Sequence, residues 1–487
     1  MRAFRARTPR TRLVPVHLPG RLTASASLLL RHGAGADPPG REGTGSTWAV
    51  LLRRDGGAGE RGARECFETG LEELGTTLTL SLGWQAVRLT LDSTPDCLAD
   101  ALALLARTLG AFRPTPQEVR ALARRRARAL AAARRAPGGS AGPLLDAALF
   151  PGSRYGRGMA GDVRSAARVD ADAVRAFHRG VLSAPRDLVV AADLARVDLR
   201  ALVRACPSPA PETAEETAEE TAEETAHRRS SEPGRPSPAD DFAARVRPLT
   251  LRRRTGGGGC VVMLGVRATA RDDAPLILEI ARRLLVATAS SRLSRALRDA
   301  SALAYSVHGE LWQDGGVCSL RLRFEVARAL VAPATVTALG ELFGLAAGEV
   351  DADDLRSTAE AYQWDSDAAT GSPAAVAAAG ATSPAVPAKH PPEGLTPARF
   401  RARAAELLAP ERVAVVVDGA GHGPEEIRRA VTAAARRDPP GRADALLAYV
   451  RRVAASGTES SGDGIGDDRD VGQEEEIDAG RTTSSRS

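Results

Sequence analysis

Two side chains in the stretch SSRLSRALRDASALAYSV, residues 290–307, can donate hydrogen bonds to a bound acceptor group. The stretch predicts a helix that Arg292 and Leu293 open and that ends near Arg298, followed by a strand that carries Tyr305. A guanidinium can donate two hydrogen bonds to a peptide carbonyl, and a phenol can donate one. The alternative interpretation is that Arg298 is a solvated cation at a helix end and Tyr305 is a packed strand residue.

Metal-binding and phosphate-binding motifs are missing from the sequence. It contains neither H-x-x-E-H nor H-E-x-x-H, and no G-K-[ST] follows the glycines at 256–259. The five cysteines are far apart and none has C-x-x-C spacing, which argues against a disulfide framework or a cysteine-based zinc site and fits a reducing cytoplasm. The histidines are scattered, and each is most simply a surface or loop residue (His17, His32, His178, His227, His308, His390 and His422).

Composition indicates a globular protein with room for two or more domains in its 487 residues. Nearly all cations are arginine, since Lys389 is the only lysine, and the net charge is only +5. The basic residues are interspersed with acidic ones, whereas a nucleic-acid-binding protein would gather them on one face. The stretch LTASASLLL (22–30) is too short and too polar to span a bilayer, and it predicts a first strand. We therefore expect neither a nucleic acid nor a membrane as a partner.

Two segments have too little apolar content to form a core. Residues 206–243 repeat AEET between proline-rich and serine-rich ends, which predicts a solvated linker. Residues 455–487 are acidic and rich in Gly and Ser, which predicts a disordered tail.

The blocks that remain, 1–205 and 244–454, show the same order of expected elements. Each has an opening strand, a helix, strands of alternating polarity, long helices and a closing apolar strand. This order predicts an α+β fold of two tandem homologous domains, each an antiparallel-rich sheet with helices packed on one face.

The sequence resembles the pitrilysin or insulinase-type metallopeptidases, the inverzincins, and specifically the short-chain members similar to mitochondrial processing peptidase. The stretch 290–307 is similar to the family's second-domain segment, in which a Ser-Ser-Arg-Leu helix leads to Arg and then to Gly-Leu-x-Tyr. Residues 149–194 are similar to a first-domain segment with Tyr-Gly and Gly landmarks. The resemblance covers both halves and implies a half-clam of two metallohydrolase-like domains.

The resemblance also exposes a departure at the metal site. The family carries H-x-x-E-H on a first-domain helix, where two histidines hold zinc and the glutamate activates water. In register, these positions become Ser46, Ala49 and Val50, and the third ligand falls near Ala129. These side chains cannot hold zinc by the usual ligands. The resemblance therefore implies a degenerate metal site, no metal or other cofactor, and no hydrolysis by this chain alone.

By the same resemblance, Arg298 and Tyr305 match a pair that contacts the substrate backbone near the scissile bond. In two-subunit members, one subunit supplies the zinc and its partner supplies this pair. We therefore expect a non-catalytic, substrate-binding subunit of a heterodimeric zinc peptidase, with a zinc-bearing homologous subunit and an extended peptide as its partners. The alternative is a non-enzymatic peptide-binding or scaffold protein that forms a homodimer.

Overall fold

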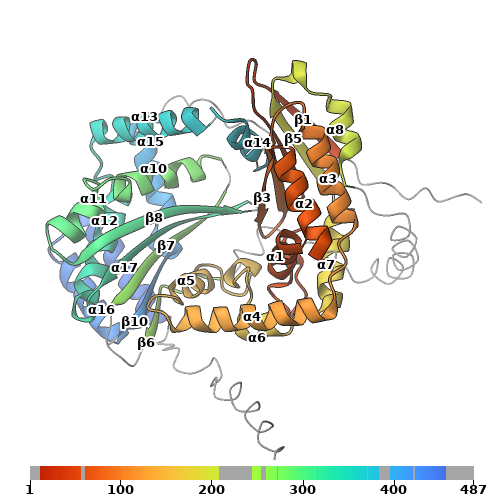
Figure 1. Cartoon of the computed structure of the whole chain (residues 1–487). Coiled ribbons are helices and arrows are strands. Elements are labelled where there is room, and N and C mark those ends of the chain that lie inside the picture. The colour runs from red at the N-terminus through yellow and green to blue at the C-terminus, as the bar shows by residue number, and fades with distance from the viewer. Residues whose placement is uncertain are drawn as a thin grey trace, which may run out of the picture.

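A computed structural model describes most of the chain. The described residues are 11–55, 61–207, 244–253, 259–270, 272–314, 316–369, 371–382, 395–420 and 423–456. The predicted linker beyond residue 207 and the predicted tail beyond residue 456 lie outside the described residues. The described chain forms two α+β halves that face each other, as Figure 1 shows.

The first half contains a five-stranded sheet with the order β1-β5-β2-β4-β3. Its strands are β1 (Thr11–His17), β2 (Ala24–Leu30), β3 (Thr77–Leu82), β4 (Val87–Ser93) and β5 (Arg186–Ala192). The β3–β4 pair is a hairpin in which the Gly83 N–H donates to the Ala86 carbonyl at 2.8 Å. All pairs are antiparallel except β1 with β5, so the sheet is mixed.

Helices cover one face of this sheet and bury its main core. They are α1 (Thr44–Asp55), α2 (Arg61–Glu73), α3 (Leu98–Gly110), α4 (Pro116–Arg135), α6 (Val163–Ala167), α7 (Ala171–Ser183) and α8 (Leu199–Ala205). The N-terminus of α4 is fixed by a capping box, in which Thr115 Oγ1 accepts from the Glu118 N–H and the Glu118 carboxylate accepts from the Thr115 N–H.

The second half repeats the arrangement, with the sheet order β6-β10-β7-β9-β8. Its strands are β6 (Leu249–Arg253), β7 (Cys260–Thr269), β8 (Ala304–Asp314), β9 (Val317–Val326) and β10 (Val413–Ala420). Its helices are α10 (Ala274–Val286), α11 (Arg292–Ser294), α12 (Val331–Ala346), α13 (Ala352–Ala369), α15 (Pro397–Leu407), α16 (Pro424–Ala435) and α17 (Pro440–Ala455). The predicted α+β fold of two similar halves is confirmed.

Three details differ from the sequence-based expectations. The strand expected at 22–30 is the second strand, because β1 precedes it; β6 likewise precedes the expected opening strand of the second half. Both extra strands pair in parallel with the closing strand, which makes the sheets mixed. The helix expected to open at Arg292 does begin there, but only its first three residues are α-helical (α11), and Arg295–Asp299 form a π-helical turn.

One helix of each half packs on the sheet of the other half. Helix α5 (Ala141–Leu149) of the first half packs on β7 and β10, and Gly265 in β7 leaves it room: a Cβ there would lie 2.8 Å from Leu149 Cδ1. Helix α14 (Pro373–Thr382) of the second half packs on β2, β5 and β4, where Val376 contacts the cluster that contains Val189. Helices therefore cover part of the second face of each sheet, beyond the single face that the sequence predicted (Figure 1).

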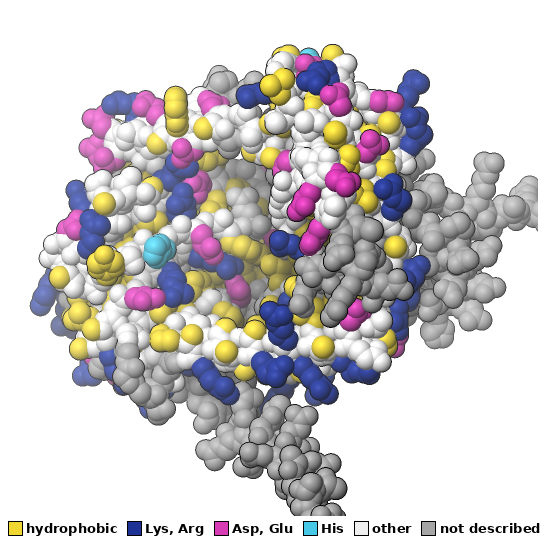
Figure 2. All heavy atoms as spheres, in the orientation of Figure 1, with side chains coloured by type: hydrophobic (Ala, Val, Ile, Leu, Met, Phe, Trp, Pro, Cys, Tyr) yellow, Lys and Arg dark blue, Asp and Glu magenta, His cyan; other side chains and the backbone are white. Residues whose placement is uncertain are grey.

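Polar contacts join the two halves beside α5. The Arg321 Nη2 of β9 lies 2.7 Å from the Asp146 Oδ1 of α5, and the same guanidinium lies over the Trp312 ring at 4.9 Å. At the end of β8, the Asp314 carboxylate accepts the Trp84 N–H at 2.5 Å. These contacts hold the two sheets at a fixed separation on this side, and Figure 2 shows the molecule hollowed between the halves.

One helical stretch within the described residues, Arg328–Ala346, is long and apolar enough to cross a bilayer by length and composition. It contains α12, whose side chains Ala338, Leu339 and Phe343 are fully buried in the second core. Its hydropathy is therefore that of a mostly buried core helix.

Candidate functional site

Arg298 lies on an exposed helical turn of the second half. It belongs to the π-helical turn η5 (Arg295–Asp299), which continues α11. Its Nε donates to Asp299 Oδ1 at 2.7 Å, and its Nη2 donates to the Ala289 carbonyl at 3.3 Å. The hydrogen bond to Asp299 is the main cause that raises the pKa of Arg298, and the Tyr305 phenol lies close enough to add to it. The side chain is 42% exposed, so the cation remains accessible to a further partner.

Tyr305 is almost entirely in solvent. Its exposed fraction is 93%, higher than that of any other large hydrophobic side chain in the described residues. It lies near the start of β8, where Ala304 pairs with Val326 and Val307 pairs with Phe324, so the strand contains one extra residue. Such a β-bulge redirects the side chains at its position. The expectation of a packed tyrosine does not fit this exposure, and the two predicted residues lie near each other.

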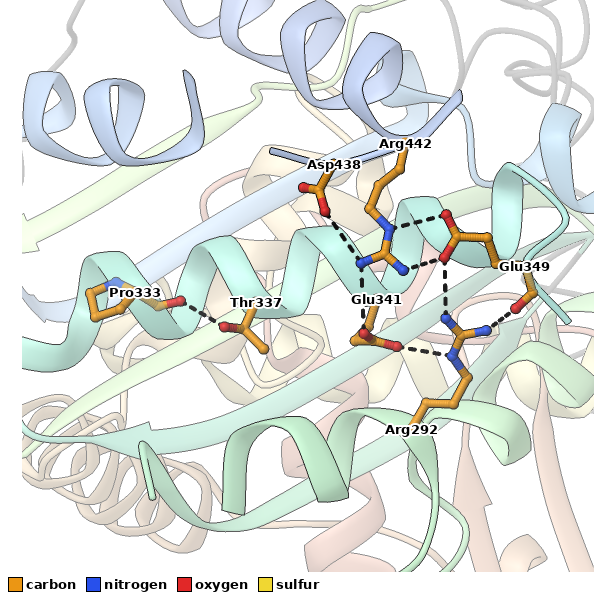
Figure 3. A network of polar contacts seen from close by, with 7 residues as sticks. All are labelled: Arg292, Pro333, Thr337, Glu341, Glu349, Asp438 and Arg442. Atoms are coloured by element: carbon orange, nitrogen blue, oxygen red, sulfur yellow. Dashed lines mark hydrogen bonds and ion pairs between the residues drawn. The ribbon is translucent and has the colours of Figure 1, made fainter. Parts of the chain in front are cut away.

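A half-buried ion-pair network fixes the start of the helical turn that carries Arg298. Arg292 Nε donates to Glu341 Oε2 of α12 at 2.9 Å, and its Nη1 donates to the Glu349 carbonyl. Arg442 of α17 donates to both carboxylate oxygens of Glu349, through Nε at 3.2 Å and through Nη2. Figure 3 shows the two guanidinium groups meeting the two glutamates between α11, α12 and α17.

The network is only partly exposed to water, with Glu349 its most exposed member at 30%, and a glycine lies close beside it. The side chains of Arg292, Arg442 and Glu341 are each 17–18% exposed. A Cβ at Gly344 would lie 2.8 Å from Arg442 Nη2 and 2.9 Å from Glu349 Oε2. The sequence pattern marks Arg292 as a helix opener, and the structure shows that it is an anchor. Its partners come from distant segments, so no local motif reveals them.

A strained residue connects η5 to β8. Ala302 has a φ of +46°, in the left-handed region that disfavours every residue with a Cβ. The Gly-Leu-x-Tyr pattern of the resembled family has a glycine where this chain has Ala302. After this turn, the Leu303 N–H donates to the Leu297 carbonyl at 2.7 Å and returns the chain to the sheet.

The degenerate metal positions lie on α1 of the first half. Ser46 and Val50 are half-buried and one turn apart, and Ala49 is 9% exposed. Between them, Trp48 is fully buried and its Nε1 donates to His178 Nδ1 at 3.1 Å. The helix is thus anchored in the core by Trp48, while positions 46 and 50 share its other side.

His178 is held in its neutral form by its surroundings. Its Nδ1 accepts from Trp48, so its Nε2 carries the proton and donates to the Leu109 carbonyl at 3.0 Å. Burial lowers the pKa of His178 to about 4. A histidine with both nitrogens occupied in this way is a core residue, and it is not available as a metal ligand.

Ala129 is exposed on α4, and the residue of α4 that reaches α1 is Arg126. Arg126 Nη1 donates to the Ser46 carbonyl at 3.5 Å, and its Nε is buried without a hydrogen-bond partner among the described residues. Burial lowers the pKa of Arg126, and the Asp37 carboxylate opposes this effect. Arg126 lies one turn before Ala129, the position that the family register indicates, so the register alone does not reveal it.

The residues at these positions do not fit zinc. Hydroxyl, methyl and isopropyl groups replace the nitrogen and oxygen ligands, and the guanidinium of Arg126 lies against the Ser46 carbonyl. Asp37, the neighbouring carboxylate, already accepts the N–H groups of Gly43 at 2.7 Å and of Gly45 at 2.8 Å, at the start of α1. Across the described ranges, no group of three or more His, Cys, Asp or Glu side chains could hold a metal ion.

A serine motif of the sequence proves to be structural. Residues 138–142 read GGSAG, which matches the G-x-S-x-G spacing of a nucleophile elbow. Such an elbow joins a strand to a helix, whereas Ser140 follows α4 and precedes α5. Ser140 is 5% exposed, its hydroxyl accepts from Arg252 Nη1, and its N–H donates to Asp418 Oδ2 at 3.1 Å. It therefore joins the two halves and does not face a substrate.

Comparison of the sequence with protein-family profiles and with curated proteins gives no match. Solved structures do match the fold. The inactive domain of a peptidase M16 from Pseudomonas fluorescens is 15% identical with a TM-score of 0.66, over 84% of this chain and 96% of that chain. A putative M16-like peptidase from Alicyclobacillus acidocaldarius is 12% identical with a TM-score of 0.60, over 84% and 97% respectively.

A ferredoxin protease, solved as a mutant in complex with Arabidopsis ferredoxin, is also similar. It is 14% identical with a TM-score of 0.60, and the match covers 83% of this chain and 43% of that chain. At these identities the likeness concerns the fold, and it extends over both halves of the chain.

Proposed function

We propose that this chain, which has the two-domain fold of the M16 peptidases, is a zinc-free homologue that binds extended peptides for a zinc-bearing partner subunit. In this role it acts in the cytoplasm, contributes no metal and performs no hydrolysis alone. The partner carries the catalytic motif, and the hollow faces of the two chains enclose the peptide.

The observation that carries this proposal is the exposure of Tyr305 beside Arg298. A phenol that is 93% in solvent adds little to the core of its own chain. Together the two side chains offer hydrogen-bond donors to a peptide carbonyl from a position next to a strand. The ion pairs and hydrogen bonds of Arg292 hold the start of the helical turn that carries Arg298 in place, which helps to fix the position of its guanidinium.

The position of β8 supports an extended ligand. β8 is the last strand in its sheet order, and an edge strand can pair with an added peptide strand. Tyr305, His308, Glu310 and Gln313 are its exposed side chains, and they offer aromatic, basic, acidic and amide contacts along one strand. A peptide bound there would pass the Arg298–Tyr305 pair at the start of the strand.

The lack of catalysis is supported by the first half. Ser46, Ala49 and Val50 cannot supply a metal ligand set or a general base for water. A two-chain arrangement is the one in which the Arg298–Tyr305 pair still has a catalytic use. The ferredoxin protease with a similar fold was solved with a protein substrate, which is in line with a polypeptide ligand for this fold.

The experiment is co-purification with a zinc-motif homologue encoded nearby, followed by peptide cleavage with the reconstituted pair. Arg298→Ala should lower the rate about ten- to hundredfold, and Tyr305→Phe should lower it less, because charged hydrogen bonds are stronger than neutral ones. Arg298→Lys should restore little activity, since an ammonium lacks the planar fork. Arg295→Ala, an exposed arginine three residues earlier, is the matched control and should leave the rate unchanged.

Melting curves of each variant separate binding from folding. Wild-type rates for both Arg298→Ala and Tyr305→Phe would contradict the proposal. If no zinc-bearing partner associates and sedimentation shows a dimer of this chain alone, the homodimeric peptide-binding or scaffold function would replace it.

A further inference from the structure

The first half holds a positive charge beside the turn on which metal ligands would stand. The carbonyl of Ser46, which Arg126 Nη1 approaches at 3.5 Å, is the helical acceptor for the N–H of Val50 in an α-helix. The guanidinium therefore lies next to the 46–50 turn. Positions 46 and 50 are four residues apart and share one side of the helix, so substituents there point into the same neighbourhood.

Arg126 reaches this place from a rigid and well-anchored helix. α4 is fixed at its start by the capping box of Thr115 and Glu118, and Val119, Leu122, Ala123 and Ala127 bury its inner face. Arg126 is half-buried, whereas Arg124, Arg125 and Arg128 on the same helix are exposed. The side chain at position 126 is thus the one of these four arginines that turns inward toward α1.

We propose that the Arg126 guanidinium takes the place of the metal ion beside α1, so that histidine ligands restored at positions 46 and 50 cannot bind zinc until Arg126 is replaced. The guanidinium, which is part of the chain, thus occupies the place of a metal ion that could dissociate. The inference concerns the metal site and does not depend on the proposed role of Arg298 and Tyr305.

Charge and geometry both support the exchange. A divalent ion beside a half-buried guanidinium would meet strong like-charge repulsion, because solvent screens such a pair poorly. The neighbouring carboxylate of Asp37 cannot offset this repulsion as a free ligand, since it already caps the Gly43 and Gly45 N–H groups of α1. Arg126 Nε is buried without a partner among the described residues, so the guanidinium is not fully satisfied by the protein.

The test compares two ways of adding a third ligand to the full-length chain. The first variant carries Ser46→His, Ala49→Glu and Val50→His together with Arg126→Glu. The second carries the same three substitutions with Ala129→Glu and keeps Arg126. Both add one carboxylate to α4, one turn apart, and only the first removes the cation.

Zinc content after dialysis and the zinc-dependent rise in melting temperature are the readouts. We expect one zinc per chain in the first variant, and an affinity at least about a hundredfold lower in the second. The triple substitution alone should behave like the second variant, and adding Arg126→Ala to it should restore part of the affinity. Equal zinc binding with Arg126 present, or none in a folded first variant, would overturn the proposal.

A metal-free measurement covers the case in which these variants fail to fold. Ser46→Glu would place a carboxylate next to the guanidinium and should raise the melting temperature, whereas Ser46→Lys should lower it. The difference between the two variants should shrink in an Arg126→Ala background and persist in an Ala129→Ser background. An unchanged difference without Arg126 would show that the guanidinium does not lie beside position 46.

Discussion

The Nε of Arg292 and the Oε2 of Glu341 lie 2.9 Å apart, and this ion pair joins the turn that precedes Arg298 to the core helix α12. Arg292→Met should lower the free energy of unfolding by about 2–3 kcal/mol, because Glu341 and Glu349 would keep their burial and lose a cation. Denaturant unfolding of the purified chain measures this. Arg295→Met, at an exposed position three residues later, should stay within about 0.5 kcal/mol of wild type; equal losses in both variants would argue against an anchoring role.

Two glycines of α12 should respond to alanine in opposite directions. At Gly344 a new Cβ would lie 2.8 Å from Arg442 Nη2 and 3.2 Å from Arg292 Nη2, so Gly344→Ala should cost about 1–3 kcal/mol. At Gly340 the nearest atom is 3.7 Å away, and Gly340→Ala should gain up to about 1 kcal/mol from its helix propensity. Thermal unfolding of the pair checks the sign of each change, and two stabilised variants would contradict the tight fit of the network.

Ala302→Gly should stabilise the chain. The residue has a φ of +46°, where a Cβ costs about 1–2 kcal/mol and glycine pays no such strain. Part of this gain is offset by the greater freedom of glycine in the unfolded chain, so we expect a net gain of about 1 kcal/mol. Ala300→Gly, two residues earlier at a φ of −80°, should instead lose about 0.5–1 kcal/mol in the same unfolding experiment.

The buried, neutral His178 should make the free energy of unfolding decrease as the pH becomes acidic. Its pKa is lowered from 6.5 to about 4 in the folded chain, so the unfolded chain binds the proton first as the pH drops. Its contribution is complete above pH 6.5 and is lost as the pH falls toward 4, with a total of about 3 kcal/mol for such a shift. His178→Gln keeps an acceptor for Trp48 and a donor for Leu109, and it should flatten this part of the pH profile.

Two buried carboxyl groups should make the free energy of unfolding change with pH in the opposite direction to His178, between about pH 4 and 6. Burial raises the pKa of Asp37 and of Asp146 to about 6, so their contributions are complete below the ordinary value of 3.8 and are lost as the pH rises to 6. The contribution of His178 is therefore read from the difference between the wild-type and His178→Gln profiles from pH 4 to 7. A constant difference across that range would contradict a neutral, buried histidine.

The strands with alternating polarity could be predicted from the sequence, and those with irregular composition could not. β3 and β4 alternate clearly, and their hairpin follows. β1 contains Pro15, and its place at the edge of the sheet makes the missing N–H tolerable. β6 is five residues long and rich in arginine, so its pairing with β10 depends on a contact across the whole second half.

The residues of the candidate site could likewise be predicted from the sequence only in part. Arg298 and Tyr305 lie in one continuous stretch, so the family resemblance of that stretch was enough to predict them as a pair. The partners of Arg292 come from α12, α17 and the loop between α12 and α13, and the approach of Arg126 to Ser46 joins α4 to α1. Such long-range polar contacts have no local periodicity, and only the packing of the helices reveals them.

Because α5 packs on the second sheet and α14 packs on the first, separating the two halves of the chain would uncover apolar surface on both. A break in the linker would leave each fragment with a helix that has lost its sheet and a sheet that has lost its helix. The apolar side chains Leu145 and Leu149 of α5, and Val376 of α14, would then be exposed. The two fragments should accordingly be poorly soluble when expressed separately and should reconstitute the fold by complementation when they are expressed together.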